Sequence, residues 1–200
     1  MTYNPEIYHR RSIRLKGYDY SQPGAYFVTV CAWNKECLFG EIKGGEMLLN
    51  ECGEIIMKCW NAIPSHFVNV GCDEFVVMPN HIHGVIFINN CRGEVSSPFS
   101  EVVLHNSKSK TALQNGGETP PLRKITLGQI VAYFKYQSAK RINDIRNTQG
   151  TPVWQRNYYE HIIRDEKELQ AIREYIRYNP LKWDEDEENP EMKRNIQKNA

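Results

Sequence analysis

The sequence has no long hydrophobic run and no Cys-x-x-Cys motif. No segment reaches the roughly 18 apolar residues that cross a membrane, so we expect no transmembrane helix. No apolar stretch follows the first five residues, so we expect no secretory signal. The spacing of the six cysteines argues against a zinc knuckle and against a disulfide framework. These absences predict a cytoplasmic protein with reduced thiols and no membrane partner.

The chain also has little net charge, +1 in total, but its charges are unevenly distributed. Residues 184–200 carry six acids and three bases, which leaves a net charge of +4 on residues 1–183. We expect residues 184–200 to form an acidic, flexible and solvated tail. The mildly basic remainder is compatible with nucleic-acid binding but does not require it.

Local patterns predict a series of strands and helices. β-branched and aromatic residues indicate strands over 25–31, 68–78, 81–88 and 152–159, and a hairpin around Gly44-Gly45. Helical spacing and capping signals indicate helices over 50–63, 126–146 and 165–179. The stretch 91–123 is rich in serine, glycine and proline and is expected to be a long loop insertion.

The order of these elements predicts the fold class. Strand, helix, two strands, helix and strand make the split β-α-β arrangement of a ferredoxin-like sandwich with an antiparallel sheet. The helix after the last strand is an addition to that fold. Because 200 residues fit one domain, we expect a single α+β domain over residues 1–183.

Two histidines separated by one residue, His81 and His83, begin the strand predicted over 81–88. Residues i and i+2 of a strand point to the same face, so the two imidazoles should lie side by side. Neutral imidazoles placed in this way can bind a divalent metal ion. The alternative is that they are ordinary polar residues at the end of a strand.

The last predicted helix carries Tyr175 and Asn179 four residues apart, which puts them on one face. A phenol can attack a phosphodiester when a metal stabilises its charge, and an amide oxygen could complete a three-ligand metal site. Spacing alone does not distinguish Tyr175 from Tyr178. Tyrosines on a half-buried helix face are also common without any catalytic role.

Three motifs together are more specific than any one of them. Met-Pro-Asn-His-Ile-His-Gly (78–84), Val-Trp-Gln-Arg-Asn-Tyr-Tyr-Glu-His (153–161) and Tyr-Ile-Arg-Tyr-Asn-Pro (175–180) follow one another along the chain. In this order they resemble the REP-associated tyrosine transposases of the single-tyrosine HUH superfamily, and the likeness covers about residues 9–183. The loop at 91–123 and the acidic tail look like departures from that family.

The resemblance implies an enzyme that cuts and rejoins single-stranded DNA at hairpins. It makes Tyr175 the nucleophile, which forms a 5′-phosphotyrosine and leaves a free 3′-hydroxyl. It makes His81, His83 and Asn179 the ligands of Mg²⁺ or Mn²⁺, which would polarise the scissile phosphate. It leaves open whether the protein is a monomer or a homodimer, and whether Tyr175 serves its own subunit.

Basic residues elsewhere are candidates for contacts with DNA phosphates, although each could be a solvated surface charge. Tyr133 and Tyr136 could stack on bases or be buried. Two other functions stay open, a hairpin-binding module that does not cut and a metal-dependent hydrolase that uses water. The basic candidates are Arg10, Arg11, Arg14, Lys16, Lys135, Lys140 and Arg141, and the resemblance adds Arg156 and His161.

Overall fold

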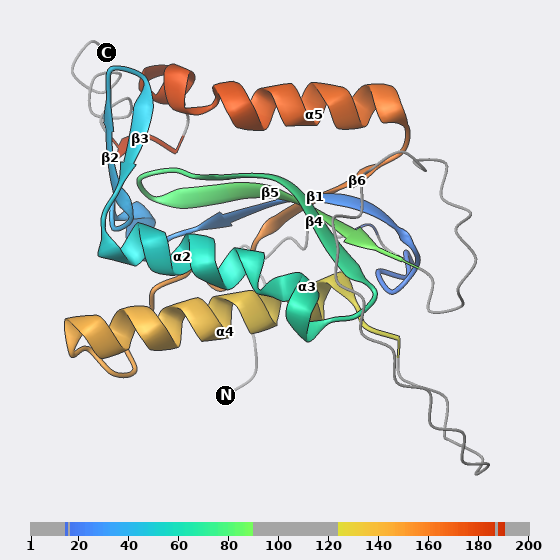
Figure 1. Ribbon diagram of the computed structural model, residues 1–200, viewed down its shortest axis with the longest axis horizontal. Helices are drawn as coiled ribbons and strands as arrows, with labels where there is room; N and C mark the ends of the chain where they lie inside the picture. Colours follow the sequence, from blue (N-terminus) through green and yellow to red (C-terminus); the bar gives the residue numbers. More distant parts are fainter. Residues whose placement is uncertain (1–14, 16, 90–123, 187, 191–200) are drawn as a thin grey trace, which may run out of the picture.

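A four-stranded antiparallel sheet organises the protein, as the computed structural model of residues 15, 17–89, 124–186 and 188–190 shows (Figure 1). Its strands are β1 (Gly24–Cys31), β4 (Val70–Val77), β5 (His81–Ile88) and β6 (Tyr159–Ile163). Their order in the sheet is β4-β5-β1-β6, and every neighbouring pair is antiparallel. This is the ferredoxin-like order, so the predicted fold class is confirmed.

One face of the sheet carries the main core. Alternate residues of β1 and β5 point to this face, among them Val28, Val30, Ile82 and Ile86, all fully buried. Two helices cover it, α2 (Glu51–Asn61) and α4 (Leu127–Arg146), with the short helix α3 (Ile63–His66) at their side (Figure 1). The Trp60 ring packs against Gly84 so closely that a Cβ at Gly84 would lie 2.4 Å from it. Glycine is therefore required next to His83.

Capping side chains set the helix starts. The Thr126 hydroxyl accepts from the Gln129 backbone N–H, and the Gln129 side chain accepts in return from the Thr126 N–H. The side chain of Asn50 caps α2, and that of Asp165 caps the last helix, α5 (Glu166–Tyr178). These three starts match the sequence prediction, because a cap is a local signal.

Of the α-helices in the described part of the chain, only α5 lies across the opposite face of the sheet (Figure 1). Leu169 and Ile176 bury their side chains against that face. Arg173 donates to Asp73 at 2.7 Å, and Arg177 donates to Glu74 at 2.8 Å. Both acids lie at a register shift between Cys72 and Phe75 in β4. Apolar contacts and two ion pairs therefore hold α5 against the sheet.

Two segments differ from the sequence prediction or refine it. The predicted strand over 152–159 is only an isolated bridge at Trp154, and the fourth strand begins at Tyr159. The Trp154 indole turns into the core instead and donates to the Ser138 hydroxyl at 2.9 Å. The predicted hairpin is present as β2 (Gly40–Lys43) and β3 (Glu46–Leu49), joined by two glycines with positive φ.

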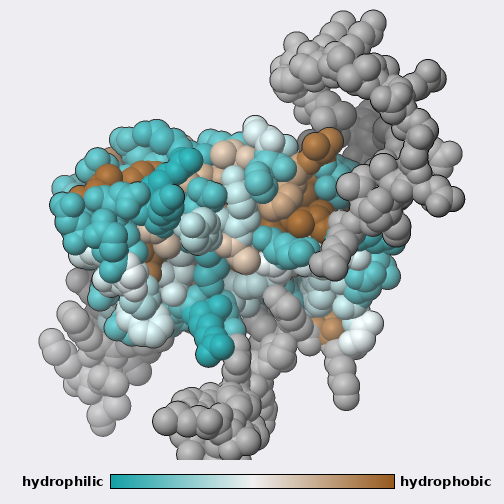
Figure 2. Space-filling model, turned by 90° about the horizontal axis from the view of Figure 1, so that it is seen from below, coloured by the Kyte–Doolittle hydropathy of each residue, from teal (hydrophilic) through white to brown (hydrophobic). Residues whose placement is uncertain are grey.

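The outer face of α4 is mostly hydrophilic, with small hydrophobic areas (Figure 2). Within the described ranges, no helix combines the length and the apolar character needed to cross a membrane. Among the cysteines in those ranges, Cys31, Cys52, Cys59 and Cys72 are free thiols.

Candidate metal and nucleophile site

Strand β5 presents His81 and His83 on the face covered by α5. Both side chains are almost completely buried, and their Nε2 atoms lie 3.0 Å apart. Burial lowers the pKa of His81 to about 4, and burial together with the nearby His81 lowers the pKa of His83. Both imidazoles are therefore neutral at physiological pH, which is the state that binds a metal ion.

Asn80 determines which nitrogen of His81 is protonated. The Asn80 amide nitrogen donates to the backbone oxygens of Lys35 and Glu188, at 3.1 and 2.7 Å. Its oxygen must therefore be the atom that lies 2.8 Å from His81 Nδ1. That contact requires a proton on Nδ1, so the Nε2 lone pair of His81 is directed toward His83.

Thr29 of β1 is the hydrogen-bond partner of the other histidine, His83. It lies opposite His83 in the strand register, and its hydroxyl is 2.8 Å from His83 Nδ1. A hydroxyl can both donate and accept, so Thr29 supports either tautomer. When it accepts from Nδ1–H, the Nε2 lone pair of His83 is available to a metal ion.

Helix α5 brings Tyr175 and Asn179 to the same place. The Tyr175 hydroxyl lies 3.3 Å from His83 Nε2, and its ring meets the His83 ring edge to face. Asn179 is the C-cap residue of α5 and is buried. Its side-chain oxygen has no hydrogen-bond partner among the described residues. A buried amide oxygen without a partner is costly, and a bound cation would satisfy it.

Part of the acidic segment folds back onto the histidines. After η2 (Pro180–Glu185), Asp186 Oδ2 lies 3.8 Å from His81 Nε2. Asp186 and the two histidines offer ligand atoms that all lie within 4.8 Å of one another. Glu188 forms an ion pair with Lys35. Asp186 and Glu188 thus contact the candidate site, where the sequence predicts a solvated tail.

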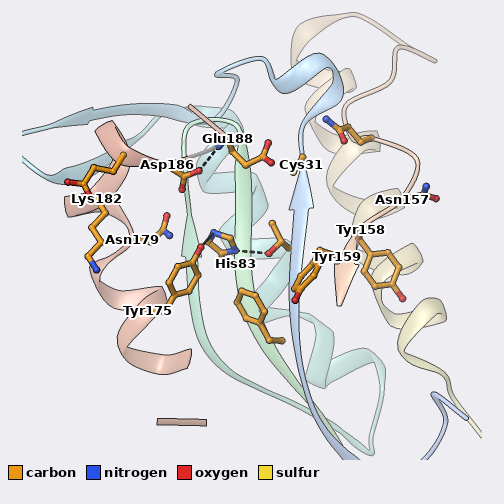
Figure 3. Close-up of a pocket in the computed structure, with 14 residues that line it drawn as sticks. Cys31, His83, Asn157, Tyr158, Tyr159, Tyr175, Asn179, Lys182, Asp186 and Glu188 are labelled. Carbon is orange, nitrogen blue, oxygen red and sulfur yellow. Dashed lines mark hydrogen bonds between the residues drawn. The ribbon is translucent and has the colours of Figure 1, made fainter. Parts of the chain in front are cut away.

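An open pocket of about 720 Å³ is lined by His83, Tyr175, Asn179 and Asp186 among others (Figure 3). Tyr175, Asn179 and Lys182 line one side of it, and Gln155, Asn157, Tyr158 and Tyr159 line the other. Glu185, Asp186 and Glu188 make a third part of the wall acidic. The combination of neutral imidazoles, an amide oxygen and a carboxylate suits a hard divalent cation, whose charge would balance the acidic wall.

The hydrogen bond between the Thr29 hydroxyl and His83 Nδ1 supports a first prediction. Thr29→Val removes the hydroxyl, so His83 loses the partner that orients its ring. We expect the affinity for Mn²⁺ to fall by about 10-fold or more, the effect typical of losing such a partner. Isothermal titration with MnCl₂ measures it. Thr29→Ser keeps the hydroxyl and should bind as the wild type does; equal losses in both variants would contradict this role for Thr29.

The depressed histidine pKa values predict a loss of stability in mild acid. In the unfolded chain both imidazoles take up protons near pH 6.5, whereas in the native protein His81 stays neutral down to about pH 4. Unfolded protein therefore binds more protons below pH 6.5. We expect the urea concentration at the unfolding midpoint of the metal-free protein to decrease when the pH is lowered from 7 to 5.5. His83→Leu should flatten this slope, and an unchanged slope would contradict the assignment.

The structure describes some of the other predicted DNA contacts and not others. Arg10, Arg11, Arg14 and Lys16 lie outside the described residues, as does the predicted loop at 91–123. Lys140 and Arg141 are exposed on α4, on the far side of the sheet from the pocket. Arg156 is exposed beside the pocket-lining residues Gln155 and Asn157.

Three further candidates make contacts within the protein. Lys135 is partly buried, and its ammonium donates to the backbone oxygens of three consecutive residues, Gln155, Arg156 and Asn157. Burial lowers the pKa of Lys135 to about 8. His161 lies 2.6 Å from Glu168 through Nε2. Of the two aromatic candidates, Tyr133 stacks on His66, whereas Tyr136 is exposed on α4.

Several residues at the site have no role in the sequence prediction. Asn80 directly precedes His81 in the motif at 78–84, and this position is the sequence signal that could have identified it as a residue of the site. Thr29 and Lys182 carry no local signal, because only the strand register and the turn after α5 bring them near the histidines. Asp186 lies in an acidic run that is also typical of a solvated tail, so the sequence does not distinguish it from its acidic neighbours. Tyr178, which spacing could not separate from Tyr175, is exposed and does not line the pocket.

Comparison with known proteins gives one extensive match. An uncharacterized protein of Haemophilus influenzae is 45% identical over 186 residues, which cover 92% of this chain and 96% of that protein. A putative REP-associated tyrosine transposase of the same species is 33% identical over 60 residues, 26% of this chain and 34% of that protein. No family model matches the chain.

Two solved structures are more distantly similar. A REP-associated tyrosine transposase bound to a REP hairpin has a TM-score of 0.49 at 16% identity, over 86% of this chain and 74% of that chain. A putative transposase from Deinococcus radiodurans has a TM-score of 0.42 at 15% identity, over 83% of this chain and 96% of that chain.

Proposed function

The chain belongs to one family with the Haemophilus influenzae protein that matches it over almost its whole length, and we propose that it is a transposase-type enzyme that cuts and rejoins single-stranded DNA at hairpins. The observation that carries this proposal is the 3.3 Å contact between the Tyr175 hydroxyl and His83 Nε2. It places the proposed nucleophile beside His83, which lines the open pocket and contacts the second neutral imidazole, His81. The first and third of the sequence motifs that resemble the REP-associated tyrosine transposases contribute these side chains.

His81, His83 and Asn179 would hold the metal ion, and Asp186 lies within reach to assist them. The two neutral imidazoles, the amide oxygen and the carboxylate would offer nitrogen and oxygen donors to a divalent cation. Mg²⁺ and Mn²⁺ are the proposed cofactors. When bound, either ion supplies positive charge that polarises the scissile phosphate.

Tyr175 would perform the cleavage. Its phenolic oxygen forms a bond to phosphorus, and the bond from phosphorus to the 3′ oxygen breaks. Tyr175 loses its proton, the 3′ oxygen gains one, and the 5′ end stays attached to the protein. Rejoining reverses the same exchange, which needs no nucleotide cofactor because the phosphotyrosine keeps the bond energy. Packing of α5 holds the Tyr175 side chain beside His83 throughout.

Other residues would bind the substrate. Lys182 lines the pocket one turn after Asn179, where its ammonium can neutralise a phosphate next to the acidic wall. Arg156 beside the pocket, and Arg10, Arg11, Arg14 and Lys16 of the N-terminal segment, are proposed to contact the DNA backbone. Lys140 and Arg141 are proposed as contacts only for DNA that extends around to α4. Lys135 and His161 would act indirectly, by holding segment 155–157 and Glu168.

The test is a search for a covalent protein–DNA adduct. We would incubate the purified protein with 5′- and 3′-labelled oligonucleotides that carry the hairpins flanking its gene, with MnCl₂, MgCl₂ or EDTA. The proposal predicts an adduct on a denaturing gel that retains only the 3′ label and disappears with EDTA. Cleavage without an adduct would favour a hydrolase that uses water. Binding without cleavage would favour a module that recognises DNA but does not cut it.

A further inference from the structure

Resting on the proposed function, we propose that Tyr159 binds the unpaired nucleobase next to the scissile phosphate by stacking on it. Tyr159 is the first residue of β6, the edge strand on the side of the sheet away from β4. It lies opposite Thr29 in the register, so its side chain points to the same face as His83. Tyr159 lines the pocket and is 47% exposed, so its ring is accessible to a ligand there.

Tyr159 and Tyr175 form two sides of an aromatic slot whose floor is Phe27. The Phe27 ring centroid lies 6.2 Å from that of Tyr159 and 6.0 Å from that of Tyr175. Both tyrosine rings are steeply inclined to Phe27, at 69° and 80°. Phe27 in turn stacks on His83 at 5.5 Å. Figure 3 shows the two tyrosines approaching from β6 and α5 on either side of His83.

The chemistry of the pocket favours a nucleobase as the occupant of this slot. The nucleoside attached to the reacting phosphate has to lie within one nucleotide of the Tyr175 hydroxyl. On the side of the histidines the wall carries Glu185, Asp186 and Glu188, which would repel a second phosphate. On the other side the lining residues are Gln155, Asn157, Tyr158 and Tyr159, two amides and two aromatic rings without charge. An unpaired base is flat and uncharged, and it gains affinity by stacking on an exposed aromatic ring.

The segment before Tyr159 is held firmly enough to make such a wall. The Lys135 ammonium donates to the Arg156 and Asn157 backbone oxygens at 3.2 and 3.4 Å, and also to Gln155. Gln155, Asn157 and Tyr158 line the pocket on the approach to Tyr159. A wall that is already ordered loses little conformational entropy when a base binds.

The experiment measures DNA binding without cleavage, in a Tyr175→Phe background. The probe is the flanking hairpin oligonucleotide with single-stranded ends, intact or with one abasic nucleotide at successive positions. We expect Tyr159→Ala to weaken binding of intact DNA by about 10-fold, within the range for one stacked base. One abasic position should cause a similar loss, and the two changes together should cost no more than either alone.

Two matched variants separate stacking from other effects. Tyr159→Phe keeps the ring and should bind as the parent does. Tyr178→Ala removes a tyrosine of similar exposure, 54%, that does not line the pocket, and it should also bind normally. A 2-aminopurine at the sensitive position reports stacking directly, since its fluorescence should be quenched by the parent and by Tyr159→Phe but not by Tyr159→Ala.

The possible results distinguish this inference from the proposed function. If the wild type forms the covalent adduct but Tyr159→Ala binds and quenches like Tyr178→Ala, the stacking role is wrong and the proposed function stands. If Tyr159→Ala weakens intact and abasic DNA equally at every position, the role is also wrong, because the lost contact is not to a base. If the parent binds no hairpin DNA, both proposals fall.

Discussion

Tyr175→Phe is expected to abolish the covalent adduct and to reduce strand cleavage on the order of 10³-fold or more. The change removes one oxygen, the atom that lies 3.3 Å from His83 Nε2 and is proposed to attack phosphorus. The phenyl ring still fits against Phe27 and His83, so the fold and the metal site should be preserved. Single-turnover cleavage of labelled hairpin DNA in MnCl₂ measures the effect.

Tyr178→Phe provides the control for this prediction. Tyr178 lies on the same helix, has a similar exposure and does not line the pocket, so its hydroxyl should be dispensable. Binding of Mn²⁺ and of hairpin DNA should be unchanged in both variants. If Tyr175→Phe still cuts DNA at the wild-type rate, Tyr175 is not the nucleophile, and attack by water becomes the better explanation. If only Tyr178→Phe is inactive, the two tyrosines have been assigned the wrong way round.

His83→Leu is expected to cause the second large loss, in metal binding and cleavage together. Leucine fills much of the same buried space but offers no lone pair, and it removes one of the two Nε2 atoms that face each other at 3.0 Å. We expect the affinity for Mn²⁺ to fall by more than about 100-fold, beyond the effect of losing an outer hydrogen-bond partner. Titration calorimetry with MnCl₂ and the cleavage assay measure the two effects.

His66→Leu is the matched control, because it removes an exposed imidazole that stacks on Tyr133 of α4. It should leave metal affinity and cleavage unchanged. The order of effects is also informative: Tyr175→Phe should keep the metal and lose cleavage, whereas His83→Leu should lose both. A His83→Leu protein that binds Mn²⁺ normally and cuts DNA would overturn the proposed ligand set.

Much of the fold follows from local signals in the sequence. The capping residues Asn50, Thr126 and Asp165 mark where three helices begin, because each cap is a contact between residues three apart. The strand predicted over 81–88 coincides with β5, since a β-rich run follows a turn. The split β-α-β order then restricts the sheet to the observed arrangement.

The sequence predicts the fourth strand over 152–159, but the strand lies at Tyr159–Ile163, so local signals predict its position wrongly. Residues 152–159 are rich in residues that favour strands, yet only Trp154 forms a bridge there. The indole of Trp154 is buried in the core, where its N–H reaches the Ser138 hydroxyl on α4. Burial of a large side chain and satisfaction of its polar group override the local preference of the backbone.

By itself the sequence determined the chemistry available to this protein, namely a His-x-His pair on one strand face and a tyrosine and an amide one turn apart on one helix face. These relations depend only on the periods of strand and helix. The tertiary structure alone decided that the two pairs meet. Packing of α5 on the sheet, aided by Arg173 and Asp73, sets the distance from Tyr175 to His83.

Only the tertiary structure also decided what surrounds the histidines. Thr29 reaches His83 through the register of β1 and β5, and Asn80 holds both His81 and the backbone of Glu188, which is 108 residues away. Asp186 stands near His81 because the chain turns back after α5. Such contacts join segments far apart in the sequence, and the free energy of packing the whole chain selects them.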